Sequence, residues 1–283
     1  MEDINEHMPA LSDAEFNELV KIIYDKTRIQ MTSHKRALVT SRLSKRLRAL
    51  KMNSFREYID FVKNAKDEEL TNFVNAVTTN KTDFFRENKH FEYMKSTFLP
   101  EWEKNFKAGK VKNLRIWSAA CSTGEEPYTI QMTLHEYFGA NYDKYDIKVL
   151  ASDIDTNVLA HGRAGIYKDE SVDPIQDNIL RKYFLKGTGD KEGLYKVKDI
   201  LKKNLFFRQL NFKDEDFDIH TQFDLIFCRN VIIYFDKEFQ KELFNKFHRY
   251  LKDDGLVFIG HSETLFGVSD KFKYVSSNIY KKI

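Results

Sequence analysis

The sequence contains few of the residues that cross-link, kink or anchor a chain. Its 283 residues include two cysteines and four prolines, and Cys121 and Cys228 lie far apart in apolar runs. This predicts reduced thiols rather than a disulfide framework, and no residue spacing suggests a metal site. No apolar run reaches the roughly 18 residues of a membrane span, and the acidic start MEDINEHMPALSDAEF lacks a signal-peptide pattern. We therefore expect a cytoplasmic protein without a bound metal and without membrane insertion.

An excess of charge of one sign is also missing. The 46 basic and 43 acidic residues give a formal net charge of +3, so total charge selects no class of partner. Hydrophobic residues make up 42% of the chain, which is enough for a large core. The length allows one large and one small domain, and we expect this division in a monomeric protein.

Glycine is absent from residues 12–76, where apolar residues recur every three or four positions and predict helices. Within this region, residues 34–51 contain basic side chains and no acidic one. Four leucines could form the buried stripe of this helix: Leu38, Leu43, Leu47 and Leu50. The basic side chains would then lie on the outer face and attract an acidic protein or a nucleic acid, although a merely solvated face is the alternative. The main candidates for this contact are Lys35, Arg36, Arg42, Lys45 and Arg46.

Residues 114–131, LRIWSAACSTGEEPYTIQ, predict a buried strand, a loop of small residues and the start of a helix. Gly124 permits backbone angles that other residues resist, so a ligand could approach this loop closely. Glu125 and Glu126 occupy the first helical turn. Two carboxylates repel phosphate and attract a cation such as an amino group. The alternative is a tight turn followed by a capped helix.

Strands and helices alternate after residue 114, which is typical of a doubly wound α/β sheet. The carboxyl ends of parallel strands meet at one edge. Polar residues follow three further predicted strands there: Asp153 and Asp155, then Asn211, then Arg229 and Asn230. One aspartate could hold ribose hydroxyls while the other caps the next helix. An amino group and a ribose without phosphate fit S-adenosylmethionine better than a dinucleotide, which requires the absent GxGxxG pattern.

Three other segments depart from this alternation. Residues 78–91, TTNKTDFFRENKHF, prefer caps and turns. Asn80, Thr82 and Arg86 could point into a site, but a helix end with a new cap is the interpretation these residues favour by themselves. Residues 187–212 contain three glycines and then alternating residues, which predict a small hairpin before a core strand. FKYVSS and NIYKKI near the C-terminus predict an antiparallel pair.

Five segments, in this order and spacing, resemble the bacterial chemotaxis receptor methyltransferases, CheR: NKTDFFRE, WSAACSTGEEPY, ASDIDTNVL, FCRNVIIYFD and GHSE. The resemblance runs from about Ser12 to the C-terminus. It implies an all-α receptor-recognition domain with linker, residues 1–88, and a class I S-adenosylmethionine-dependent methyltransferase domain, residues 89–283. The implied sheet is Rossmann-like, seven-stranded and mostly parallel, with an antiparallel C-terminal strand. A small antiparallel β-subdomain is implied at about 186–206.

The implied reaction is methyl transfer from S-adenosylmethionine to glutamates in the cytoplasmic helices of chemoreceptors, which leaves S-adenosylhomocysteine and glutamyl methyl esters. Arg86 and Tyr234 would lie beside the reacting centre. No general base is needed, because a glutamate with a pKa of about 4.3 is already ionised at neutral pH. The resemblance implies these cofactor contacts: Asn80, Thr82, Arg86, Gly124, Glu125 or Glu126, Asp153, Asn211, Arg229 and Asn230.

The resemblance also implies two receptor contacts. The basic helix 34–51 would face the acidic methylation helices, where complementary charge speeds and orients encounter. The segment with Gly187 and Gly189 resembles β-subdomains that bind a receptor's C-terminal pentapeptide as an added strand.

Two other functions fit parts of the sequence. A nucleic-acid methyltransferase could place helix 34–51 on phosphates, but the aromatic platform expected near an exposed base is missing. A noncatalytic sensor could bind S-adenosylmethionine and signal through the N-terminal helices, although all the residues proposed for the reaction are present.

Overall fold

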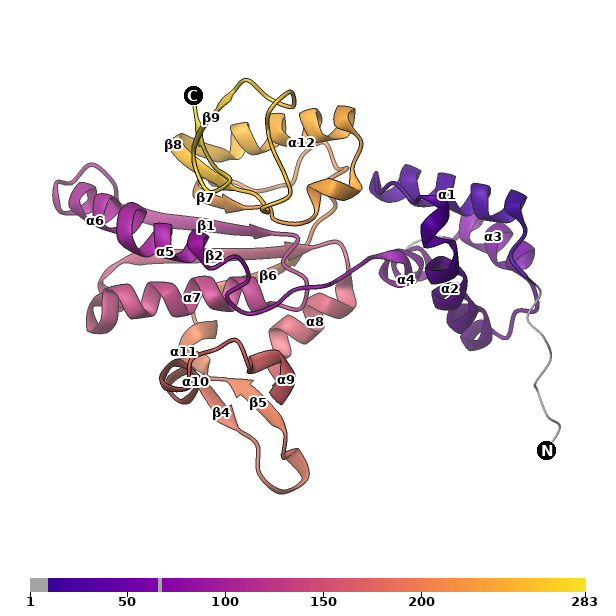
Figure 1. The fold of residues 1–283 in the computed structure, drawn as a ribbon, viewed down its shortest axis with the longest axis horizontal. Coiled ribbons are helices and arrows are strands. Elements are labelled where there is room, and N and C mark those ends of the chain that lie inside the picture. The colour runs from indigo at the N-terminus through magenta and orange to yellow at the C-terminus, as the bar shows by residue number, and fades with distance from the viewer. Residues whose placement is uncertain (1–9, 66–67) are drawn as a thin grey trace.

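The computed structural model describes residues 10–65 and 68–283. The prediction about a signal peptide concerns mainly residues 1–9, which lie outside the described residues. A linker joins a helical N-terminal domain to a larger domain built around a sheet (Figure 1). The N-terminal helices are α1 (Asp13–Thr27), η1 (Ser33–Lys35), α2 (Arg36–Leu50), α3 (Phe55–Asn64) and α4 (Glu68–Val77).

Capping and an apolar stripe shape the N-terminal domain. A capping box starts α1, since the amide of Glu15 donates to the Ser12 hydroxyl at 3.3 Å and the Ser12 amide to the Glu15 carboxylate at 2.9 Å.

The stripe of α2 is rotated from the predicted one: Val39 is buried with Leu43 and Leu47, whereas Leu38 is 36% exposed. The prediction that Leu38 belongs to the buried stripe is therefore wrong.

Two basic side chains of α2 turn inward, contrary to prediction. Both carboxylate oxygens of the buried Glu69 on α4 accept from Nε of Arg46, at 2.9 and 3.0 Å. Arg42 donates to the backbone carbonyl of Thr78. A buried carboxylate requires a partner of opposite charge, so these arginines fasten α2 to α4 and the linker. Lys45 remains exposed.

Seven strands form the main sheet in the order β6-β2-β1-β7-β8-β10-β9. Parallel pairing joins β6 through β8, whereas β10 pairs antiparallel with β8 and β9. This confirms the mostly parallel sheet and the antiparallel pair near the C-terminus. The strands are β1 (Asn113–Ala119), β2 (Asp146–Asp153), β6 (Leu205–Gln209), β7 (Phe223–Phe227), β8 (Leu251–Phe258), β9 (Phe272–Ser276) and β10 (Ile279–Lys282). The apolar run 223–235 reads as one strand in the sequence, but β7 ends at Phe227 and η5 (Ile232–Tyr234) follows it.

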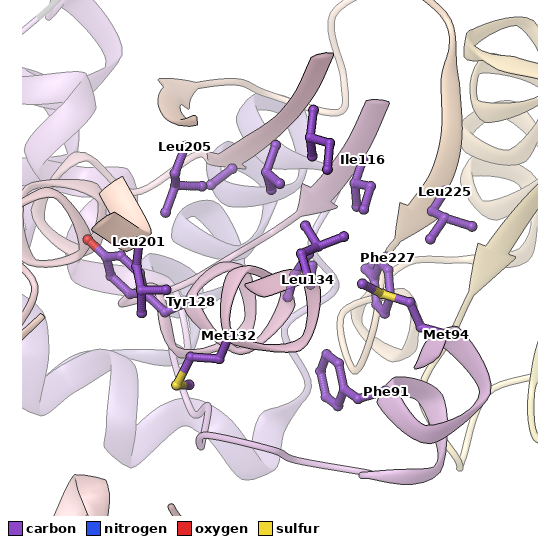
Figure 2. Close-up of a cluster of buried hydrophobic side chains, with 14 of the residues drawn as sticks. Phe91, Met94, Ile116, Tyr128, Met132, Leu134, Leu201, Leu205, Leu225 and Phe227 are labelled. Atoms are coloured by element: carbon purple, nitrogen blue, oxygen red, sulfur yellow. The ribbon is translucent and has the colours of Figure 1, made fainter. Parts of the chain in front are cut away.

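Both faces of the central strands are buried, so their side chains need not alternate between apolar and polar. Ile116 and Phe227 belong to the core beneath α7, whereas Trp117 and Ile226 belong to the core beneath α12. Figure 2 shows the first core, where Phe91 and Met94 approach the sheet beside α7. The covering helices are α5 (Lys89–Tyr93), η2 (Met94–Phe98), α6 (Leu99–Lys107), α7 (Glu125–Phe138), η3 (Gly139–Lys144), α8 (Thr156–Ala164) and α12 (Lys237–Tyr250).

A second sheet of three antiparallel strands has the order β3-β5-β4. It projects below the main sheet in Figure 1. Its first strand already begins at Ile166, so the sheet starts before the predicted range 186–206 and contains more than a hairpin. Its strands and nearby helices are β3 (Ile166–Lys168), α9 (Asp169–Val172), α10 (Asp177–Tyr183), β4 (Phe184–Lys186), η4 (Gly189–Lys191), β5 (Leu194–Val197) and α11 (Asp199–Lys202).

None of the helices within the described residues is long and apolar enough to cross a membrane.

Candidate active site

A cleft opens at the carboxyl ends of β1, β2, β6 and β7, where the linker and the end of α1 cover the sheet. Its empty space, including the open mouth, is about 1030 Å³. Most of the predicted site residues line this cleft: Lys35, Asn80, Thr82, Arg86, Glu126, Asp153, Asn211, Arg229, Asn230 and Tyr234. Gly124 and Glu125 are not among the lining residues.

The loop after β1 has an unusual backbone. Ala120 (φ 65°), Ser122 (φ 50°) and Gly124 (φ 100°) all adopt left-handed conformations. For residues other than glycine such conformations are costly, and they cluster at functional sites. A methyl group on Gly124 would lie 3.0 Å from the Cα of Gly162 and 3.0 Å from the Tyr167 hydroxyl. A side chain at position 124 would thus crowd α8 and strain a left-handed backbone, so glycine suits the close packing of the loop against α8.

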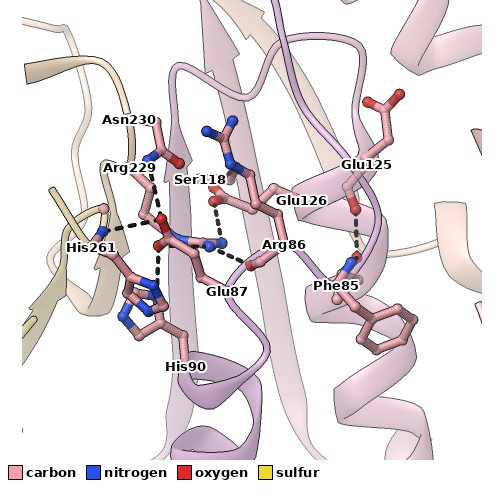
Figure 3. Close-up of polar contacts among 12 residues, drawn as sticks. Phe85, Arg86, Glu87, His90, Ser118, Glu125, Glu126, Arg229, Asn230 and His261 are labelled. Atoms are coloured by element: carbon pink, nitrogen blue, oxygen red, sulfur yellow. Dashed lines mark hydrogen bonds and ion pairs between the residues drawn. The ribbon is translucent and has the colours of Figure 1, made fainter. Parts of the chain in front are cut away.

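The two glutamates at the start of α7 point to different places (Figure 3). Glu126 lines the cleft and accepts hydrogen bonds from the Ser118 hydroxyl at 2.6 Å and from Arg229 at 3.1 Å. Glu125 instead accepts from the Thr123 hydroxyl at 2.6 Å. Burial raises the pKa of Glu125 to about 7, and burial also raises the pKa of Glu126 while Arg229 opposes that rise. Of the two, Glu126 is the carboxylate that faces the cleft.

The two aspartates at the carboxyl end of β2, Asp153 and Asp155, have different roles. Asp153 lines the cleft, and its carboxylate accepts from the amides of Ser122 at 2.8 Å and Asp155 at 3.0 Å. Burial raises the pKa of Asp153 to about 6. Asp155 caps α8 and also accepts from the Thr78 hydroxyl at 2.8 Å and the Asn80 amide group at 2.7 Å. The predicted cap by one aspartate is therefore confirmed, and that same residue holds the linker.

The linker forms one wall of the cleft. Phe85 (φ 54°) and Glu87 (φ 56°) flank Arg86 in left-handed conformations. The guanidinium of Arg86 donates to the Lys81 carbonyl at 2.9 Å, and the Arg86 carbonyl accepts from Arg229. The turn places Arg86 on the cleft and Glu87 behind it (Figure 3).

Arg229 and Asn230 are held at the end of β7 by acidic residues. The Arg229 side chain is 3% exposed and lies between Glu87 at 3.0 Å and Glu126 at 3.1 Å. The Asn230 side chain donates to Glu87 at 3.1 Å, and the Asn230 amide to Glu263 at 2.9 Å. Glu87 was not identified from the sequence, although Arg229 inside the apolar run 223–235 implies an acidic partner elsewhere and Asn230 a hydrogen-bond partner.

Within the described residues, one group could share a metal ion: Glu87, His90 and His261. The Glu87 carboxylate already accepts from Arg229, from Asn230 and from the His261 amide at 3.0 Å. Burial lowers the pKa of His90 to about 4, and Nε2 of this histidine lies 2.6 Å from the Ser277 carbonyl. Because these donors already bind the Glu87 carboxylate, the group is better explained as a salt-bridge network than as a metal centre.

The N-terminal domain completes the mouth of the cleft. Nζ of Lys35 lies 4.3 Å from the ring centroid of Tyr234, and burial lowers the pKa of this lysine. The amide of Gln30 donates to the Tyr234 carbonyl at 2.8 Å. Asn211 donates to the Lys26 carbonyl at 2.8 Å. Lys35, predicted only as a receptor contact, thus lies beside the tyrosine predicted at the reacting centre.

The remaining predicted residues lie outside the cleft. Arg36 forms an ion pair with Asp13 on α1. Gly187 and Gly189 lie in the connection between β4 and β5, and a methyl group on Gly187 would overlap the Lys191 carbonyl at 2.0 Å. Gly187 therefore shapes the β-subdomain and is remote from the linker wall.

Comparisons with known proteins agree with this architecture. The model of the CheR methyltransferase S-adenosylmethionine-binding domain matches residues 80–281, and that of the CheR all-alpha domain matches residues 14–78. The chain belongs to the CheR methyltransferase family. The chemotaxis protein methyltransferase of Borreliella burgdorferi is 41% identical over 269 residues, which cover 95% of this chain and 94% of that protein. The one from Salmonella typhimurium is 40% identical over 272 residues, which cover 96% and 91%.

Membership of the family identifies the cofactor as S-adenosylmethionine and the chain as a chemotaxis methyltransferase that depends on it. The cleft fits such a donor, because Glu126 provides a partly buried carboxylate and Asp153 a buried one at a parallel-sheet edge.

Proposed function

We propose that this chain forms methyl esters on glutamate side chains of methyl-accepting chemoreceptors. These esters would serve the adaptation of the receptors during chemotaxis. The observation that carries the proposal is the acid-lined cleft of a CheR-family chain, which Arg86 and Tyr234 border. The acceptor helices of such receptors are cytoplasmic, so we also place the reaction in the cytoplasm. That the protein acts as a monomer stays a prediction.

The residues of the cleft suggest how the cofactor would be held. Glu126 would receive the ammonium group and Asp153 the ribose hydroxyls, because a carboxylate can accept from both hydroxyls of a diol. Glu125 would act only indirectly, since its carboxylate turns to Thr123. The other proposed cofactor contacts are Asn80, Thr82, Arg86, Asn211, Arg229 and Asn230, with Gly124 supporting the loop.

The chemistry places few demands on the protein. S-adenosylmethionine supplies a methyl group made electrophilic by a sulfonium. The acceptor carboxylate is ionised near neutral pH, so no residue needs to remove a proton. An oxygen of that carboxylate forms the new bond to carbon, and the electron pair of the broken bond stays on sulfur. The task of the protein is alignment, which can contribute roughly 7 to 11 kcal/mol.

Arg86 and Tyr234 are the side chains proposed to align the acceptor. A guanidinium can hold a carboxylate through two parallel hydrogen bonds, and a tyrosine hydroxyl can orient one of its oxygens. Tyr234 lies beneath Lys35, whose positive charge at the mouth would also attract an anionic acceptor.

Receptor recognition is proposed to use two surfaces. Lys35 at the end of η1, with Arg36 and Lys45 on α2, would face the acidic methylation helices, while Arg42 and Arg46 support α2 from within. In the small sheet, β3 and β4 are the outer strands. A receptor pentapeptide could add to one of these edges, with Gly187 and Gly189 shaping the adjacent turn.

The test is methyl transfer from labelled S-adenosylmethionine to chemoreceptor-containing membranes, with RNA as the competing acceptor. We expect label on receptor protein that mild alkali releases, as a carboxyl ester requires. Label in RNA would support a nucleic-acid methyltransferase. Donor binding without transfer to either acceptor would indicate a sensor, and either result would defeat the proposal.

A further inference from the structure

Glu87 lies behind the linker wall of the cleft, yet the proposed reaction gives it no role. Its side chain is 11% exposed. Its carboxylate accepts from Arg229 at 3.0 Å, from Asn230 at 3.1 Å and from the His261 amide at 3.0 Å. A left-handed backbone at a non-glycine residue (φ 56°) is needed to turn this carboxylate inward.

The position of Arg229 depends on two competing carboxylates. One Nη of its guanidinium contacts Glu87 and the other contacts Glu126, which faces the cleft. The Arg86 carbonyl accepts from the Nη on the side of Glu87. Without Glu87, this buried cation would have Glu126 as its remaining carboxylate partner, because a buried charge is stable only when it is paired.

The charges of the three groups bear on cofactor binding. Two carboxylates and one guanidinium leave one negative charge at the floor of the cleft. Burial raises the pKa of Glu126, Arg229 lowers it, and the charge of Glu87 adds to the rise, so the ionisation of Glu126 depends on both neighbours. A carboxylate that is not fully neutralised can still accept a hydrogen bond from an ammonium group.

We propose that Glu87 is a positioning residue, which draws Arg229 toward the linker and thereby leaves Glu126 available to the ammonium group of the methyl donor. The inference rests on the proposed function of Glu126 as the ammonium contact. It assigns to the linker an electrostatic role in addition to carrying Arg86.

Ligand binding to the full-length protein tests this role without any acceptor. S-adenosylhomocysteine carries the ammonium group, whereas 5′-methylthioadenosine shares its nucleoside and lacks it. Calorimetry gives the affinity of the first ligand, and competition gives that of the second. The variants are Glu87→Gln, Glu87→Asp and, as a matched control, Glu92→Gln at an exposed glutamate of the adjoining helix.

In Glu87→Gln we expect the affinity for S-adenosylhomocysteine to fall about tenfold or more, the scale of one lost hydrogen bond to a charged group. The affinity for 5′-methylthioadenosine should stay at the wild-type value. Glu92→Gln should bind both ligands as the wild type does. Glu87→Asp keeps the charge but reaches less far, so its loss should be selective for S-adenosylhomocysteine and smaller.

Equal losses for both ligands in Glu87→Gln would mean that Glu87 merely supports the fold, and no loss for either would mean that Arg229 does not depend on it. Both results overturn the proposal. If Glu87→Gln does not fold, the affinities of Glu87→Asp for the two ligands are compared instead. A loss selective for S-adenosylhomocysteine supports the proposal, whereas equal losses or no loss overturn it. A wild-type protein that binds these ligands but methylates no receptor would defeat the proposed function and leave this inference standing.

Discussion

Replacing Asp155 with alanine should destabilise the protein by more than the loss of a helix cap. Asp155 is 2% exposed and caps α8 through the amides of Asn157 at 2.8 Å and Val158 at 3.3 Å. It also accepts hydrogen bonds from Thr78 at 2.8 Å and Asn80 at 2.7 Å in the linker. The substitution therefore removes a cap and two interdomain bonds.

The size of the effect follows from these contacts. Loss of the cap costs about 1 kcal/mol, and each lost hydrogen bond to the carboxylate costs about 1.5 to 3 kcal/mol. We therefore expect the free energy of unfolding to fall by at least about 4 kcal/mol. Binding of S-adenosylhomocysteine should weaken as well, because Asn80 loses its partner at the cleft.

Urea denaturation followed by circular dichroism measures this change, with Ser54→Ala as a matched control. Ser54 caps α3 by accepting from the amide of Glu57 at 3.1 Å, so its loss should cost about 1 kcal/mol. If Asp155→Ala costs no more than Ser54→Ala, the bonds from the linker do not stabilise the junction between the domains, and the reasoning is refuted.

Three further predictions concern activity and binding. Arg86→Ala should lower kcat about a hundredfold or more with unchanged thermal unfolding, since alignment is lost; wild-type turnover would remove Arg86 from the site. Glu126→Gln should weaken calorimetric donor binding, whereas Glu125→Gln should not, and equal effects would contradict their different orientations. Donor affinity should fall as the pH drops through about 6, because Asp153 then takes up a proton; an identical pH profile in Asp153→Asn would exclude this cause.

A fifth prediction concerns the β-subdomain. Gly187→Ala should distort the β4–β5 connection, because the new methyl group would overlap a backbone carbonyl, and should abolish calorimetric binding of a receptor pentapeptide. Gly109→Ala is the matched control, since Gly109 lies outside the β-subdomain and a methyl group there meets no atom within 4 Å, although a left-handed backbone (φ 72°) opposes it. Equal peptide binding by both variants and the wild type would place the tether elsewhere.

Much of the fold could be predicted because its signals are local. Ile116 and Trp117 are apolar residues on opposite faces of β1, as a central parallel strand requires. Ser12 with Glu15, and Asp155 before α8, are capping patterns that the structure reproduces. The cleft at the strand ends follows from the same alternation, because parallel strands bring their carboxyl ends together.

The features that could not be predicted from the sequence depend on contacts between distant residues. Glu87 acquires its importance from Arg229, 142 positions away in the sequence. The inward turn of Arg46 depends on Glu69, which lies on another helix. The strand Ile166–Lys168 is too short to carry a clear pattern and pairs with a strand near residue 195. Periodicity within one segment contains no information about such partners.

The central claim is that the acid-lined cleft delivers a methyl group to a glutamate carboxylate. The most direct measurement is peptide mass spectrometry of a purified receptor cytoplasmic fragment after incubation with the protein and S-adenosylmethionine. We expect a mass increase of one methylene on specific glutamates, lost on treatment with mild alkali and absent when those glutamates are changed to alanine. An alkali-stable methyl group, or one on lysine or arginine, would contradict the account.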